Sequence, residues 1–123
     1  MRLVRIGYWE GETPSGLPHP LAFVDPSWDI EERETLSVYL SRGFIVRAYL
    51  GKSVCRVCGI ANGALELSDG VFVWPEGLAH YIGEHGVRLP TRFVEHALNR
   101  TAALEEGEID DDWWRSQAAL IFN

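Results

Sequence analysis

Residues 55–85 read CRVCGIANGALELSDGVFVWPEGLAHYIGEH, and this stretch decides how the chain folds. It contains both cysteines of the protein, Cys55 and Cys58, and two of its four histidines, His80 and His85. Two thiolates at C-x2-C spacing can bind one ion when the chain turns tightly, and Gly59 allows backbone amides to approach the sulfurs. We therefore predict that Cys55, Cys58, His80 and His85 bind one metal ion.

The residues between the cysteines and the histidines predict a hairpin and then a helix. ALELSDGVFVW alternates as a strand pair does, with Asp69-Gly70 as its turn. Pro75 suits the first position of a helix, which we expect to run to about Glu84 and to end at Gly86. We expect Trp74 to pack beside the metal site.

The resulting order is a turn with two sulfurs, a hairpin, and a helix with two nitrogens. Over residues 54–87 this order resembles the two-cysteine, two-histidine zinc fingers, which implies a bound zinc ion. The stretch departs from that class because 21 residues separate Cys58 from His80, against about a dozen in the usual finger. The run WPEGLAHY is also similar to one in an uncharacterised family of small bacterial proteins, and this second resemblance implies no function.

The spacing of the two histidines is a difficulty for the predicted site. Five residues rotate an ideal helix by about 500°, so His80 and His85 lie about 140° apart around the axis. They can meet if the last turn loosens at Gly83 and Gly86, since glycine tolerates unusual backbone conformations. If the helix stays regular, His96 or a carboxylate such as Glu84 is the alternative fourth ligand.

The ligand set predicts a structural role for the metal rather than a catalytic one. Four protein ligands fill a tetrahedron, whereas a catalytic zinc keeps one position open for water. Neither an HExxH motif nor the deaminase order of histidine before paired cysteines occurs. An iron–sulfur cluster needs more cysteines than the two in this chain. A thioredoxin-like dithiol needs a helix after the first cysteine, and the residues GIANGALE that follow are unlike a helix. We expect zinc and a protein that is not an enzyme.

The remaining sequence predicts a single α+β domain over residues 1–123, with a small antiparallel sheet and three to four helices. We expect strands at 1–8 and 44–50, and helices at 29–41, from Pro90 or Thr91 onward, and at 110–123. A loop rich in glycine and proline precedes the first helix. The apolar residues expected to be buried in these segments are Leu17, Leu21, Phe23, Trp28, Ile30, Leu36, Val38, Tyr39, Leu40, Phe93, Val94, Ala97, Leu98, Leu104, Trp113 or Trp114, Leu120 and Ile121.

The net charge of −7 lies wholly in the second half of the chain. Residues 1–60 contain seven basic and seven acidic side chains, and residues 61–123 contain four and eleven. Such a surface disfavours broad contact with nucleic acid. Arg47, Lys52 and Arg56 lie in a segment without acids, and they can stabilise the thiolates, contact a phosphate, or remain solvated.

These patterns favour a protein-interaction module with a structural zinc, of the inhibitor or immunity type among others. The segment EEGEIDDDWW places Trp113 and Trp114 beside many acids, which suits a surface for a basic partner protein. The alternatives are a zinc-finger-like regulator that binds nucleic acid and, third, a zinc-dependent hydrolase. The absence of an apolar leader or a long apolar run predicts a cytoplasmic protein without a membrane segment.

Overall fold

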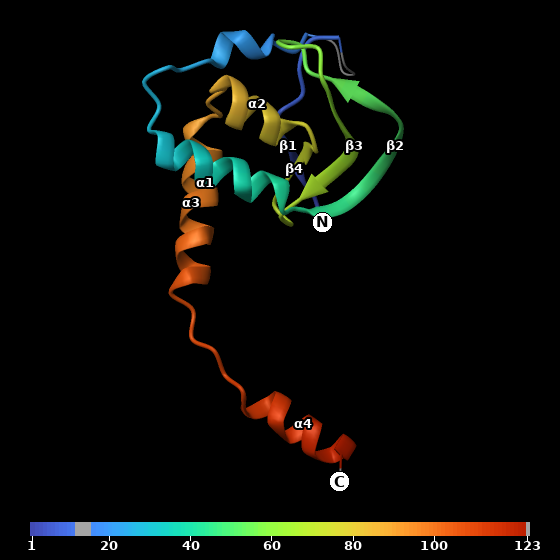
Figure 1. The fold of residues 1–123 in the computed structure, drawn as a ribbon, viewed down its shortest axis with the longest axis vertical. Helices are drawn as coiled ribbons and strands as arrows, with labels where there is room; N and C mark the ends of the chain where they lie inside the picture. The colour runs from blue at the N-terminus through green and yellow to red at the C-terminus, as the bar shows by residue number, and fades with distance from the viewer. Residues whose placement is uncertain (12–15, 123) are drawn as a thin grey trace.

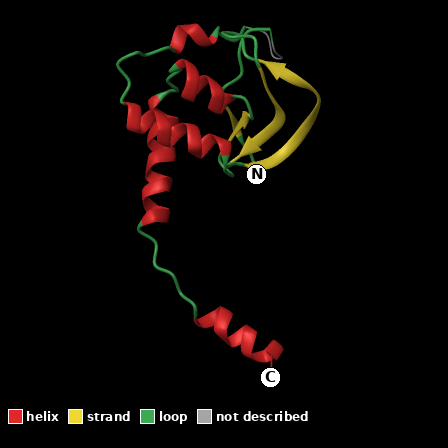
Figure 2. Ribbon diagram, in the orientation of Figure 1, coloured by secondary structure: helices red, strands yellow, loops and turns green. Residues whose placement is uncertain are grey.

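The computed structural model describes residues 1–11 and 16–122 and has the expected α+β architecture (Figures 1 and 2). A sheet packs against three helices, and a fourth helix projects away from them (Figure 1). None of the helices among these described residues is long and apolar enough to cross a bilayer. The elements in chain order are β1 Val4–Arg5, a short 3₁₀ helix Pro20–Phe23, α1 Ile30–Ser41, β2 Phe44–Val54, β3 Ala61–Ser68, β4 Phe72–Pro75, α2 Leu78–His85, α3 Thr91–Glu105 and α4 Asp112–Phe122.

The sheet has the strand order β1-β4-β3-β2. The pairs β2–β3 and β3–β4 are antiparallel, as predicted, but β1 runs parallel to β4, so the sheet is mixed. The predicted hairpin turn is confirmed: Ser68 pairs with Val73, and Gly70 has φ 93°. The Asp69 carboxylate accepts hydrogen bonds from the backbone N–H groups of Val71 and Phe72, at 2.9 and 2.8 Å, which fixes this turn.

The prediction that Pro75 begins a helix is wrong. Pro75 is the last residue of β4 and pairs with Glu66. The ladder continues into Glu76, whose backbone N–H donates to the Leu65 carbonyl at 2.8 Å and whose carboxylate accepts from the Ala64 N–H. These bonds hold the chain extended against β3, so α2 begins only at Leu78.

One face of the sheet and helices α1, α2 and α3 enclose the core. Leu36, Leu40, Trp74, Ile82 and Phe93 are at most 1% exposed. The Trp74 indole donates to the Leu40 carbonyl at 2.9 Å, and its ring packs against Phe93. Trp74 therefore joins β4 to α1 and α3, and the prediction that it packs beside the metal site is wrong.

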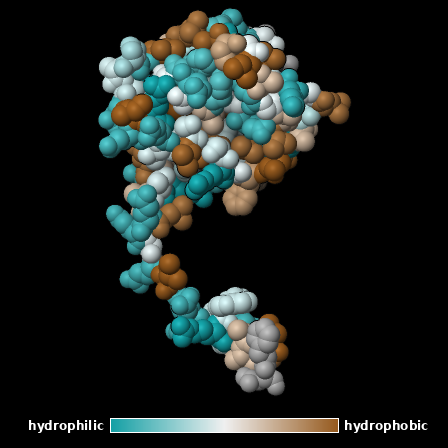
Figure 3. All heavy atoms as spheres, in the orientation of Figure 1, coloured by the Kyte–Doolittle hydropathy of each residue, from teal (hydrophilic) through white to brown (hydrophobic). Residues whose placement is uncertain are grey.

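Several apolar residues predicted to be buried are exposed. Leu36 and Leu40 lie one helical turn apart and face the core, whereas Val38 lies about 200° around the axis from Leu36 and is 48% exposed. On α4, Trp113 and Trp114 are 70% and 61% exposed because this helix does not pack into the core (Figure 3). The other residues of this kind are Leu21, Ile30, Leu104, Leu120 and Ile121.

Gly43 is required where α1 passes into β2. A Cβ atom there would lie 2.9 Å from Trp74 Cζ2, 3.0 Å from Leu67 Cβ and 3.2 Å from the Ser68 backbone nitrogen. Gly43→Ala is expected to lower the free energy of unfolding by about 1–3 kcal/mol, since the fully buried indole has no room to move. The matched control is Gly51→Ala, where a Cβ meets nothing within 4 Å. Equal urea midpoints for the two variants would contradict this packing.

Candidate metal centre

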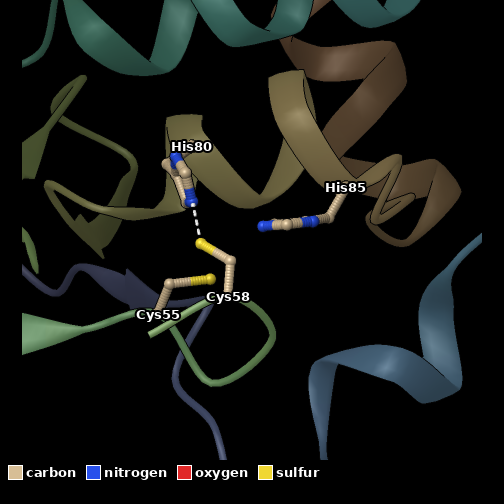
Figure 4. A group of neighbouring side chains, drawn as sticks. All are labelled: Cys55, Cys58, His80 and His85. Carbon is tan, nitrogen blue, oxygen red and sulfur yellow. Dashed lines mark hydrogen bonds between the residues drawn. The ribbon is translucent and has the colours of Figure 1, made fainter. Parts of the chain in front are cut away.

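The four predicted ligands lie together, although they come from two distant segments. Cys55 follows the last residue of β2, Cys58 lies in the turn before β3, and His80 and His85 lie on α2. Their four side chains converge on one point (Figure 4), and one ligand atom from each lies within 4.8 Å of the other three. Cys58 Sγ and His80 Nε2 are 3.3 Å apart, close to the roughly 3.6 Å separation that tetrahedral zinc geometry gives a sulfur and a nitrogen.

The cysteine turn is held by its own backbone. The Gly59 N–H donates to the Cys55 carbonyl and the Cys55 N–H donates to the Ile60 carbonyl, both at 2.9 Å. Gly59 has φ 76°, which favours glycine. The Val57 N–H points at Cys55 Sγ, 3.4 Å away. A backbone N–H donor therefore lies beside one of the two sulfurs that can bind the metal.

The two histidines meet without a break in the helix. α2 remains helical through His85, and only Gly86 turns left-handed, with φ 64°. The Gly86 N–H donates to the Ile82 carbonyl, as in an αL cap, and the Val87 N–H donates to the Tyr81 carbonyl. The expected loosening is therefore confined to the residue after the helix. The two side chains bend toward each other from different sides of the helix, so that their ring centroids are 5.0 Å apart.

The alternative fourth ligands lie outside the cluster. His96, on α3, has its Nε2 atom 2.8 Å from an oxygen of Asp69, so it belongs to the β3–β4 turn. Glu84 is exposed and is not part of the four-residue group. His85 thus completes the set that the spacing predicted.

His85 provides an independent indication that the cluster receives an ion. Its Nε2 atom is buried and has no hydrogen-bond partner among the described residues. A buried nitrogen without a partner costs about 1–3 kcal/mol. Burial, together with the nearby His80, lowers the pKa of His85, which favours the neutral imidazole that can bind a metal. A cation at the centre of the four side chains gives this nitrogen a partner.

Tyr81 supports the centre, and the sequence analysis missed it. Its hydroxyl accepts a hydrogen bond from the Arg56 backbone N–H at 2.8 Å, between the two cysteines. Its ring lies 6.2 Å from that of His80 and 6.4 Å from that of His85. A tyrosine between two predicted ligands gives no sequence signal of its own, because only the fold brings α2 over the cysteine turn.

The other predicted site residues lie in three separate places. Arg47 and Lys52 line one pocket on the sheet. The Arg56 side chain donates instead to the backbone carbonyl of Glu10, at 2.9 Å. Trp113 and Trp114 lie on α4, away from the cluster (Figure 1). The three cations of the sequence analysis therefore do not form one patch around the sulfurs.

Comparisons with protein-family models, with curated proteins and with solved structures gave no match for this chain. The likeness to zinc fingers is therefore a likeness of ligand type and order. The donor set itself has definite chemistry: two thiolates and two imidazoles suit a tetrahedral ion of zinc type. The cluster can hold such a metal ion.

Purified protein is expected to contain one zinc per chain by elemental analysis. Cys55→Ser and His85→Ala are each expected to reduce this content to below half, because three ligands bind zinc more weakly than four. Cobalt substitution should give the strong visible absorption of a tetrahedral site with two sulfurs. His19→Asn is the control, since His19 caps the 3₁₀ helix through a bond to the Leu21 N–H. Full zinc content in both ligand variants would contradict the assignment.

Tyr81→Phe is expected to weaken zinc binding by up to about tenfold, because it leaves the Arg56 N–H without its acceptor and loosens the cysteine turn. The phenylalanine retains the ring contacts with both histidines, so the substitution isolates the hydroxyl. The measurement is competition with a chromophoric chelator. An unchanged zinc affinity would show that the turn is already rigid without this bond.

Proposed function

We propose that this protein is a protein-interaction module whose fold is stabilised by a structural zinc ion. The observation that carries the proposal is the convergence of Cys55, Cys58, His80 and His85. With all four bound, no coordination position remains for a water or a substrate, as in structural zinc sites. The ion then joins the end of the β2–β3 hairpin to α2 and contributes directly to folding.

The surface that we assign to a partner is α4 with the acidic segment before it. Residues 105–112 read EEGEIDDD, with six acids in eight residues. The helix that follows exposes Trp113, Trp114, Leu120 and Ile121 by 61–76%. Large apolar side chains beside concentrated negative charge suit an apolar groove with a basic rim on a partner protein.

Two further functions are less well supported. Binding of nucleic acid in a groove requires cations on the inserted helix, and α2 contains neither lysine nor arginine. A zinc hydrolase requires an open position, whereas the cluster offers four protein ligands. A zinc-edge absorption spectrum tests the second alternative, because an oxygen ligand in place of one nitrogen would favour catalysis.

The partner surface is tested with the double variant Trp113→Ser/Trp114→Ser in the full chain. Capture from the source cells, read by mass spectrometry, is expected to yield a basic protein with the parent chain and to lose it with the variant. The control Arg115→Gln changes the same helix but keeps both indoles. Zinc content and the urea midpoint are expected to stay unchanged, since both indoles are mostly exposed.

A lower urea midpoint for the double variant would contradict the assignment, because it would mean that α4 packs on its own domain in solution. Equal capture of the same protein by the parent chain and the double variant would also contradict it. Sedimentation of the parent chain gives its mass in solution, and a dimer that the double variant does not form would mean that α4 binds a second copy of this protein.

A further inference from the structure

The face of the sheet opposite the helices carries a second candidate site. Neighbouring residues of a strand point to opposite faces. On β3, Leu67 packs in the core with Trp74, so Glu66 points to the other face, where it pairs with Arg47 on β2 and Pro75 on β4. An open pocket of about 540 Å³ lies on this face, and residues of β1, β2, β3 and β4 all line it.

Glu66 is only 2% exposed although it points away from the core. The cover consists of polar side chains. The hydroxyls of Tyr8 and Tyr49 both donate to Glu66 Oε2, the second at 2.9 Å. Burial and the bond to Glu66 raise the pKa of Tyr8, so its hydroxyl stays protonated and remains a donor at physiological pH. Both tyrosine rings line the pocket.

The cations around this pocket exceed the charge of the buried carboxylate. Arg5 and Arg47 each have a nitrogen 3.9 Å from Glu66, which is too long for a hydrogen bond. Their side chains are 46% and 62% exposed, so their N–H groups remain accessible. Lys52 lines the same pocket. The nearby carboxylates are Glu66 and Glu76, which accepts a hydrogen bond from the lining residue Ala64. Three positive charges against these two leave a local excess of +1, in a chain whose net charge is −7.

We propose that this pocket binds the phosphate group of a small phosphomonoester. Such a group carries a charge of about −1.5 to −2 at neutral pH, which is opposite in sign to the excess at the pocket. Two guanidinium groups offer the paired donors that phosphate oxygens accept, and Lys52 adds a point charge. The volume lies within the range of small-molecule sites. The tyrosine rings give the organic part of the ligand an apolar surface.

This site is independent of the metal centre and of α4, and the test uses the zinc-loaded full chain. The probes are inorganic phosphate, adenosine 5′-monophosphate and adenosine, titrated calorimetrically at low salt. The monophosphate is expected to bind, inorganic phosphate to compete with it, and adenosine not to bind. Arg47→Gln and Lys52→Gln are each expected to raise the Kd for the monophosphate by about tenfold.

Arg115→Gln, on α4, is the control for the loss of one positive charge and is expected to leave the affinity unchanged. Lys52→Gln guards against misfolding, because among the described residues Arg47, but not Lys52, forms an ion pair with the buried Glu66. The proposal is overturned if neither phosphate nor the monophosphate binds at millimolar concentration, or if Lys52→Gln binds like the parent chain. Binding of a short single-stranded oligonucleotide without binding of the monophosphate would assign the pocket to a nucleic acid and also overturn it.

Discussion

The convergence of four side chains that can bind one metal ion is the constraint on which the rest of this structure depends. The cysteine turn lies at the far end of a long hairpin, and α2 lies against it with its two imidazoles pointing inward (Figure 4). The buried Nε2 atom of His85 has no partner among the described residues. The arrangement is therefore energetically incomplete without an ion, and a chain of 123 residues has a modest core with which to offset that cost.

The position of α2 has consequences for both faces of the sheet. On the helical face, α2 packs beside α1, and Arg33 of α1 donates to the carbonyls of Ile82 and Gly83 in the last turns of α2. These bonds and the metal ligands hold the same short helix from two sides. On the opposite face, residues of all four strands line the pocket beside Glu66. The sheet thus lies between the apolar core with the cluster of four potential ligands and the pocket lined by Arg5, Arg47 and Lys52.

Negative and positive charges are concentrated on different parts of the molecule. Six acids lie in residues 105–112, just before and at the start of α4, which projects from the body (Figure 1). The excess positive charge lies around Arg5, Arg47 and Lys52. A net charge of −7 therefore describes neither surface. The two proposed binding surfaces therefore lie on different elements, one on α4 and one on the sheet.

The sequence by itself predicted the cluster of four potential ligands, the hairpin at Asp69-Gly70 and most helices, because these features depend on short-range patterns of turn residues, caps and ligand spacing. It misplaced the start of α2, because the pairing that keeps Pro75 in β4 and the bond from Glu76 to Leu65 both depend on β3. It also predicted burial for the aromatic residues of α4, since an amphipathic pattern does not say whether a matching surface exists in the same chain. Tyr81 over the cysteine turn, and the meeting of Arg5, Arg47 and Glu66 from three strands, were decided only by the tertiary structure. Strand order and register bring such residues together, and neither quantity is encoded in the spacing of any one segment.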